Sequence, residues 1–404
     1  MIGAGLYVHV PFCLQRCPYC AFNAVAGHQE FIPDYVESVI AEIGQRGTRL
    51  TRRPVVSVYF GGGTPSLLAP AQVEAILHAA RRSPGIRDAA EITLEANPGT
   101  VDVARLRAYR LAGVNRLSLG VQSLDDRVLR WLGRAHSAAE GIAACTAARS
   151  AGFRNLNVDL MFGIPATPAG TWEDALQRVL MLHPEHISTY ALTLEEGTAL
   201  AARASAQRDR GPDEEEDAAA YQQARHTLQQ AGYRHYEVSN FALTGRECRH
   251  NWSCWHGAEY LGVGAGAHSY LRGVRCWNHA RLEDYLAAVQ AGDEVCAGQE
   301  IIDVDTSRRE RVWMQLRTDT GVALGRTERQ SLQASPRFAV LREAGFLTWY
   351  EERLCLGTPG WAVADSLGVE VDAILEDSRH RKPRITAYRR GLERAEQPPG
   401  HRAR

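Results

Sequence analysis

Short apolar runs alternate with longer amphipathic stretches through the first two thirds of the chain. This alternation predicts βα units around a parallel sheet. We expect six strands, at Leu6–Val10, Val55–Phe60, Glu91–Glu95, Arg116–Val121, Asn155–Met161 and His186–Thr193. We expect helices between them, at Pro33–Gln45, Pro70–Arg81, Val101–Ala112 and Trp172–Leu182. The predicted fold is therefore α/β, a partial (β/α)6 barrel of the TIM type, with its chemistry where the strands end.

The pattern changes after Gln299 to helices with one short apolar hairpin, Phe346–Tyr350 and Arg353–Leu356. We predict a barrel domain with a connecting segment over residues 1–298 and a smaller α+β domain over residues 299–377. Residues 378–404 are rich in arginine, and their composition predicts a disordered tail. Contact of this basic tail with RNA, or transiently with a membrane, is the alternative.

Composition and charge narrow the setting. The formal net charge of -1 gives no reason to expect a nucleic acid partner. The chain has no basic leader before an apolar stretch and no run of about 18 apolar residues, so we expect a cytoplasmic protein. Its nine cysteines are an odd number, and three of them lie close together near the start. That distribution favours metal binding in a reducing compartment over a disulfide framework.

The three clustered cysteines follow the first predicted strand directly, in the pattern Cys13-x3-Cys17-x2-Cys20. Three thiolates on one loop can each hold one iron of a 4Fe-4S cubane, which leaves the fourth iron open to another molecule. A structural zinc site would need a fourth ligand, and the nearest downstream histidine, His28, has no typical ligand spacing. A ferredoxin would also need a fourth cysteine, so both alternatives are disfavoured.

Polar residues at the ends of the next strands support a ligand site beside the cysteines. Gly61-Gly62-Gly63-Thr64 follows the second strand, and three glycines in succession let the backbone approach a ligand closely. Glu95, Gln122 and Asp159 lie at or near the ends of the third, fourth and fifth strands. Strand ends of a barrel meet at one mouth. Arg134 follows in a helical segment, where we expect it to pair with Asp159.

Together these motifs resemble the radical SAM superfamily, and in particular the HemN/HemW family of coproporphyrinogen III dehydrogenases and heme chaperones. The resemblance covers Leu6 to about Leu356 and includes a winged-helix-like C-terminal domain. It implies a 4Fe-4S cluster on Cys13, Cys17 and Cys20, with S-adenosylmethionine on its open iron. By motif, the residues implied to contact S-adenosylmethionine are Tyr7, Tyr19, Gly62, Gly63, Thr64, Glu95, Gln122, Arg134 and Asp159.

Two features indicate a branch of this family. The dehydrogenases carry a further cysteine where this chain has Phe22, and they have an N-terminal extension where this chain opens on its first strand. Both departures favour the heme chaperones. The resemblance then implies heme as cargo, heme-acceptor proteins as partners, and an electron donor such as flavodoxin or ferredoxin. Radical decarboxylation of coproporphyrinogen III, or another radical reaction on a tetrapyrrole, stays open as the alternative.

A heme contact is expected at His250. The segment His250-Asn-Trp-Ser-Cys254-Trp resembles the family's His-Asn-x-x-Tyr-Trp motif, with Cys254 in place of the tyrosine. Histidine is a common axial ligand of heme iron. The alternative for His250 is a hydrogen-bonded residue that fixes its loop, and for Cys248 and Cys254 a buried structural role. The glycine-rich segment 262–269 is expected to form a cavity wall or a tight turn.

Overall fold

The computed structural model describes residues 3–50, 55–165, 167, 170–206 and 213–380 of the chain. The chain divides into two compact units, Met1–Thr320 and Gly321–Arg404. The predicted tail lies outside the described residues from position 381 onward. Among the described residues, no helix combines the length and the apolar character needed to cross a membrane.

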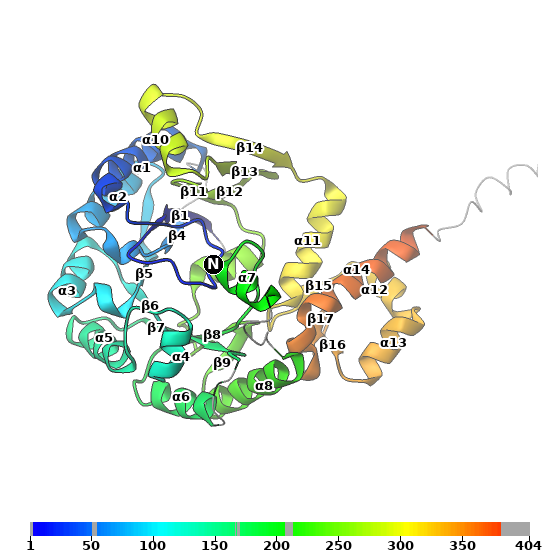
Figure 1. The fold of residues 1–404 in the computed structure, drawn as a ribbon. Helices are drawn as coiled ribbons and strands as arrows, with labels where there is room; N and C mark the ends of the chain where they lie inside the picture. Colours follow the sequence, from blue (N-terminus) through cyan, green and yellow to red (C-terminus); the bar gives the residue numbers. More distant parts are fainter. Residues whose placement is uncertain (1–2, 51–54, 166, 168–169, 207–212, 381–404) are drawn as a thin grey trace, which may run out of the picture. The chain divides into compact units, whose positions relative to one another are not determined.

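The first unit is built on parallel strands that curve around a common axis (Figure 1). Six of these strands lie side by side in the same order in which they occur along the chain. The strands are β1 (Ala4–Val10), β4 (Val55–Gly62), β5 (Ile86–Ala96), β6 (Arg116–Gln122), β7 (Leu156–Phe162) and β8 (His186–Ala191). Their residues are buried on both faces, as in β1, β6 and β7, which is typical of a parallel sheet covered by helices. The prediction of a partial (β/α)6 barrel is confirmed.

Helices cover the outside of these strands (Figure 1). Local signals fix several of their ends. Asp102 caps the third helix by accepting from the Arg105 N–H, and Ser137 with Glu140 forms a capping box on the fifth. The helices of this unit are α1 (Ile32–Arg46), α2 (Pro70–Arg82), α3 (Val103–Ala112), α4 (Asp126–Trp131), α5 (Ala138–Ser150), α6 (Thr171–Leu180), α7 (Ala199–Ser205), α8 (Glu214–Gln230), α9 (Arg249–Trp255), α10 (Leu282–Ala291) and α11 (Val304–Leu316).

The sheet continues beyond the six predicted strands on both sides, which the sequence analysis did not foresee. On one side β11 pairs in parallel with β1, and three antiparallel strands follow it. On the other side two short antiparallel strands follow β8. The added strands are β9 (Arg234–Glu237), β10 (Asn240–Ala242), β11 (Tyr260–Val263), β12 (His268–Leu271), β13 (Val274–Asn278) and β14 (Cys296–Ile301). The glycine-rich segment 262–269 forms the turn between β11 and β12.

The second unit is α+β, as expected. Its three short strands form an antiparallel sheet in the order β15-β17-β16, and β16 with β17 is the predicted hairpin. Its elements are α12 (Arg326–Gln333), α13 (Pro336–Glu343), α14 (Ala364–His380), β15 (Val322–Ala323), β16 (Leu347–Tyr350) and β17 (Arg353–Leu356). The domain boundary expected after residue 298 falls inside β14, which pairs with β13. The division into compact units comes later, between Thr320 and Gly321.

Candidate functional site

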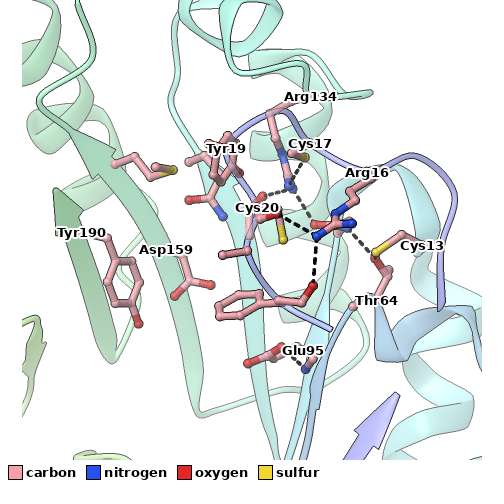
Figure 2. A pocket seen from close by; sticks show the side chains of 18 of the residues that line it. Cys13, Arg16, Cys17, Tyr19, Cys20, Thr64, Glu95, Arg134, Asp159 and Tyr190 are labelled. Atoms are coloured by element: carbon pink, nitrogen blue, oxygen red, sulfur yellow. Dashed lines mark hydrogen bonds between the residues drawn. The ribbon is translucent and has the colours of Figure 1, made fainter. Parts of the chain in front are cut away.

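A cavity of about 420 Å³ opens where the parallel strands of the first unit end (Figure 2). Five chain segments line it: the cysteine loop, the glycine turn after β4, the ends of β5 to β7, Arg134 after α4, and the stretch from Tyr190 to Glu195 at and after the end of β8. The lining includes most of the residues that the sequence analysis selected. These are Cys13, Cys17, Tyr19, Cys20, Gly62, Gly63, Thr64, Glu95, Gln122, Arg134 and Asp159.

The cysteine loop is closed at its base by a short parallel pair of strands, β2 (Phe12–Cys13) and β3 (Val25–Ala26). Its tip folds on itself, because the Cys20 N–H donates to the Cys17 carbonyl at 3.1 Å. Arg16 donates to the Cys20 and Phe22 carbonyls at 3.3 and 3.5 Å. The loop therefore holds a defined shape through its own backbone, with all three sulfurs on the cavity lining (Figure 2).

Contacts from the barrel fix the base of the loop. The Asn23 side chain donates to the carbonyls of Ala265 and Ala280, at 3.1 and 2.9 Å, and the Asn23 carbonyl contacts His9 Nε2 at 2.8 Å. Gln29 donates to the Cys13 carbonyl at 3.0 Å. The loop is thus tied to β1 and to the turn between β11 and β12.

The donor set fits an iron–sulfur cubane. Cys13, Cys17 and Cys20 are free thiols of intermediate exposure. Burial raises the pKa of Cys13 and of Cys20, while hydrogen bonds from Thr64 to Cys13 and from the Phe22 backbone to Cys20 act in the opposite direction. In the described part of the chain, no three His, Cys, Asp or Glu side chains converge closely enough to hold one metal ion. A cubane instead takes one thiolate at each of three irons, and three separate thiols on one loop can supply them.

The glycine turn owes its composition to contacts within the protein. A Cβ on Gly63 would lie 2.7 Å from the Phe12 carbonyl oxygen, and a Cβ on Gly62 would lie 2.5 Å from the His9 ring. Gly62 also has a φ of 114°, a backbone angle that residues with a side chain rarely adopt. The close approach of this turn to the end of β1 therefore explains these glycines. Both still line the cavity.

Two carboxyl groups face the cysteine loop across the cavity (Figure 2). Glu95 accepts from the Tyr59 hydroxyl at 2.7 Å and from the Gly62 N–H at 3.3 Å. Burial raises the pKa of Glu95 to about 7, and the nearby Asp159 adds to the shift. Asp159 accepts from Asn157 at 2.7 Å and from Ser118 at 3.4 Å, and burial raises its pKa too. A cationic ligand bound between Glu95 and Asp159 would stabilise their ionised forms and so offset the free energy cost of burying them.

Gln122 ends β6 with a φ of 66°, a conformation that costs energy for a residue with a side chain. The register of β6 against β7 also shifts between Leu119 and Gln122. This local distortion brings Gln122 onto the cavity lining. Such strain often occurs at ligand sites, where the surrounding structure holds it in place.

Arg134 contacts the cysteine loop and does not pair with Asp159, contrary to our expectation. Its guanidinium donates to Cys17 Sγ at 3.5 Å, to Asn97 Oδ1 at 2.5 Å and to the Gly120 carbonyl at 2.8 Å. A buried arginine takes acceptors wherever they are close, and the backbone at Gly120 is closer than the β7 carboxylate. A positive charge therefore lies next to Cys17.

Tyr7 and His250 lie behind the cavity and are not among its lining residues. His250 is 7% exposed, its Nδ1 is 3.1 Å from Ser57 Oγ, and burial lowers its pKa to about 4. Its ring centroid is 5.2 Å from that of Tyr59 and 6.2 Å from that of Tyr7. These contacts favour the alternative role, a hydrogen-bonded histidine that fixes its own segment against the barrel. Cys248 and Cys254 are likewise held in buried surroundings, which raise the pKa of each to about 12.

Sequence reasoning missed Asn97, Arg16, Tyr59 and Tyr190. Asn97, Arg16 and Tyr190 line the cavity, and Tyr59 holds Glu95 from behind. Asn97 and Tyr190 each lie near the end of a barrel strand, the same signal that selected Glu95 and Gln122. The position at a strand end therefore also indicates Asn97 and Tyr190 as candidate site residues.

Comparisons with known proteins agree with this geometry. Residues 7–179 match the model of the radical SAM superfamily. The chain is 37% identical to a Bos taurus protein described as radical S-adenosyl methionine domain-containing protein 1, mitochondrial, over 93% of this chain and 88% of that protein. It is 36% identical to the Mycobacterium tuberculosis protein described as heme chaperone HemW, over 90% of this chain and 93% of that protein.

Among solved structures, the Escherichia coli coproporphyrinogen III oxidase HemN, described as a radical SAM enzyme, superposes with a TM-score of 0.78. The match covers 92% of this chain and 90% of that one at 23% identity, so it speaks to the fold alone. The family assignment rests on the Bos taurus and Mycobacterium tuberculosis relatives, which match most of this chain at 37% and 36% identity. The chain therefore belongs to the radical SAM superfamily and, within it, to the family of the proteins described as radical S-adenosyl methionine domain-containing protein 1 and heme chaperone HemW.

Proposed function

We propose that this chain is a radical SAM-type heme chaperone. It holds a 4Fe-4S cluster through Cys13, Cys17 and Cys20, binds S-adenosylmethionine beside the cluster, and carries heme to acceptor proteins. The observation that supports this most is the cysteine loop facing a cavity lined by Glu95 and Asp159. When bound, the cluster would supply one electron for cleavage of a sulfonium bond, the electron coming from a donor such as a flavodoxin or ferredoxin.

The chain's own residues would bind and orient the small molecule. Glu95 and Asp159 suit the ammonium and hydroxyl groups of S-adenosylmethionine, because buried carboxylates favour cations and donors. Gln122 offers an amide that both donates and accepts. Arg134 places a positive charge at the cysteine loop, where its guanidinium donates a hydrogen bond to Cys17 Sγ.

Heme as cargo is supported by the relatives described as heme chaperone HemW. It is also supported by Phe22, which lines the cavity and is 67% exposed. The dehydrogenases of the family have a cysteine at that position, and this chain offers an apolar ring that suits the face of a porphyrin. His250 is buried and is not among the residues that line the cavity, so the proposal does not assign it the axial bond.

The test is a comparison of two activities on anaerobically reconstituted protein. We expect heme to bind at about one per chain and to pass to an added apo-hemoprotein, with no conversion of coproporphyrinogen III to protoporphyrinogen IX. A Cys296→Ser variant should behave as the wild type in both assays, since this cysteine lies in β14 away from the cavity. Robust conversion, or failure to bind heme, would overturn the proposal.

A further inference from the structure

Asn97 joins two of the cluster cysteines through a chain of hydrogen bonds. Arg134, which donates to Cys17 Sγ at 3.5 Å, also donates to Asn97 Oδ1. Asn97 Nδ2 donates to Thr64 Oγ1 at 2.9 Å, and the Thr64 hydroxyl donates to Cys13 Sγ at 3.5 Å. Figure 2 shows the two outer contacts, Arg134 with Cys17 and Thr64 with Cys13. The amide lies between a cation and a hydroxyl that each reach a sulfur.

Chemistry fixes the orientation of the amide. Arg134 can only donate, so the amide oxygen must face it and the amide nitrogen must face Thr64. Thr64 Oγ1 then accepts from Asn97, which leaves its own hydrogen free to point at Cys13. All the donors in the chain therefore run toward sulfur, an arrangement in which each bond polarises the next.

The surrounding backbone is built around this amide. The Asn97 carbonyl accepts from the N–H and the hydroxyl of Thr100, at 3.0 and 2.7 Å, which fixes the turn after β5. A Cβ on Gly120 would lie 3.1 Å from Asn97 Oδ1 and 3.4 Å from Arg134 Nη2. The absence of a side chain at Gly120 thus makes room for the contact between Arg134 and Asn97.

We propose that Asn97 is a positioning residue that holds Thr64 and Arg134 against Cys13 and Cys17 and so sets the reduction potential of the cluster. Hydrogen bonds to the sulfurs and nearby charge are the main means by which a protein tunes an iron–sulfur cluster. Donors directed at sulfur stabilise the reduced, more negative cluster. The inference rests on the proposed function, because it requires a cluster on this loop.

Asn97→Asp separates this role from simple support of the loop. The new carboxylate can still accept from Arg134, but it has no N–H for Thr64. The Thr64 hydroxyl then turns to donate to the carboxylate, so that Cys13 loses its donor and the site gains a negative charge. Both changes disfavour reduction. We expect the equilibrium constant for one-electron reduction to fall on the order of tenfold, about 59 mV toward negative potential.

Two substitutions at Thr64 calibrate the effect. Thr64→Val keeps the branched shape but removes the hydroxyl, so it should shift the potential in the same direction. Thr64→Ser keeps the hydroxyl and should restore the wild-type value. If Asn97 acts through Thr64, the double variant Asn97→Asp with Thr64→Val should shift less than the sum of the two single variants.

The experiment is a redox titration of the full-length, reconstituted proteins followed by electron paramagnetic resonance, with iron and sulfide assayed on each sample. A negative shift in Asn97→Asp and in Thr64→Val, with subadditive behaviour, supports the proposal. Potentials equal to wild type, or strictly additive shifts, overturn it. If Asn97→Asp does not retain a cluster, Asn97→Ala, which also removes the N–H that faces Thr64, takes its place in the same comparison. Failure of the wild-type protein to assemble a cluster would instead refute the proposed function.

Discussion

Glu95 should make the protein without its cofactors less stable as pH rises. The pKa of Glu95 is about 7 in the fold, against an ordinary value of 4.5. Below pH 4.5 the carboxyl is protonated in both the folded and the unfolded chain. Between pH 4.5 and 7 the unfolded chain releases the proton while the folded chain keeps it, so stability falls with rising pH. At about 1.4 kcal/mol per pKa unit, the full loss is roughly 3 kcal/mol above pH 7.

Glu95→Gln removes this dependence. The new amide oxygen can still accept from Tyr59, but its N–H₂ group would face the Gly62 N–H, which we expect to cost about 1 kcal/mol. The variant should therefore be about 2 kcal/mol more stable than wild type at pH 8.5 and up to about 1 kcal/mol less stable at pH 4. A residue that destabilises the empty cavity in this way suits a site whose ligand supplies the missing charge.

Urea unfolding of the reduced protein without cluster, at pH 4, 6 and 8.5, measures this difference. Glu283→Gln is the matched control, because Glu283 is a surface residue with a side chain 60% exposed. Its effect should stay within about 0.5 kcal/mol at each pH. If Glu95→Gln destabilises the protein equally at pH 4 and pH 8.5, then burial does not raise the pKa of Glu95 as described.

Three further predictions concern the surroundings of the cavity. Tyr59→Phe removes a hydrogen bond that lowers the pKa of Glu95, so the fall in stability should still begin near pH 4.5 but extend to higher pH and become larger in the same unfolding assay. Gly63→Ala should lower the free energy of unfolding by about 1–3 kcal/mol, since its Cβ would meet the Phe12 carbonyl. Gly44→Ala, at an exposed position in a helix, should raise it by up to about 1 kcal/mol. Equal urea midpoints for the two variants would contradict this prediction. His250→Phe should leave the heme absorption maximum unchanged, and a shifted maximum would return His250 to the role of axial ligand.

The barrel strands could be predicted because their burial on both faces leaves nearly continuous apolar runs. The run ending at Val10 and the run ending at Phe60 each coincide with an observed strand. The antiparallel strands at both sides of the sheet were missed. Several of them, such as Asn240–Ala242, are too short to carry a pattern, and their pairing depends on partners far away in the chain.

The cysteine loop could likewise be found from its spacing and the strand ends from the apolar runs, since a barrel brings its strand ends to one mouth. The residues expected to contact S-adenosylmethionine followed only from the resemblance. Contacts across the cavity could not be predicted. Arg134 was expected in a helix, but it follows the end of α4 and reaches Cys17 from there; no pattern in the sequence encodes that distance. His250 was expected at a heme and is buried against Ser57, because α9 packs on the first residues of β1 and β4.

Electron paramagnetic resonance of the reduced protein, recorded with and without S-adenosylmethionine, tests whether Cys13, Cys17 and Cys20 hold a cluster with an open iron. We expect about four irons and four sulfides per chain and a spectrum that changes when S-adenosylmethionine is added, because the fourth iron has no ligand from the cysteine loop. A triple variant of Cys13, Cys17 and Cys20 to Ser should lose the signal, while Cys296→Ser should keep it. A cluster that persists in the triple variant, or a spectrum that S-adenosylmethionine leaves unchanged, would contradict the account.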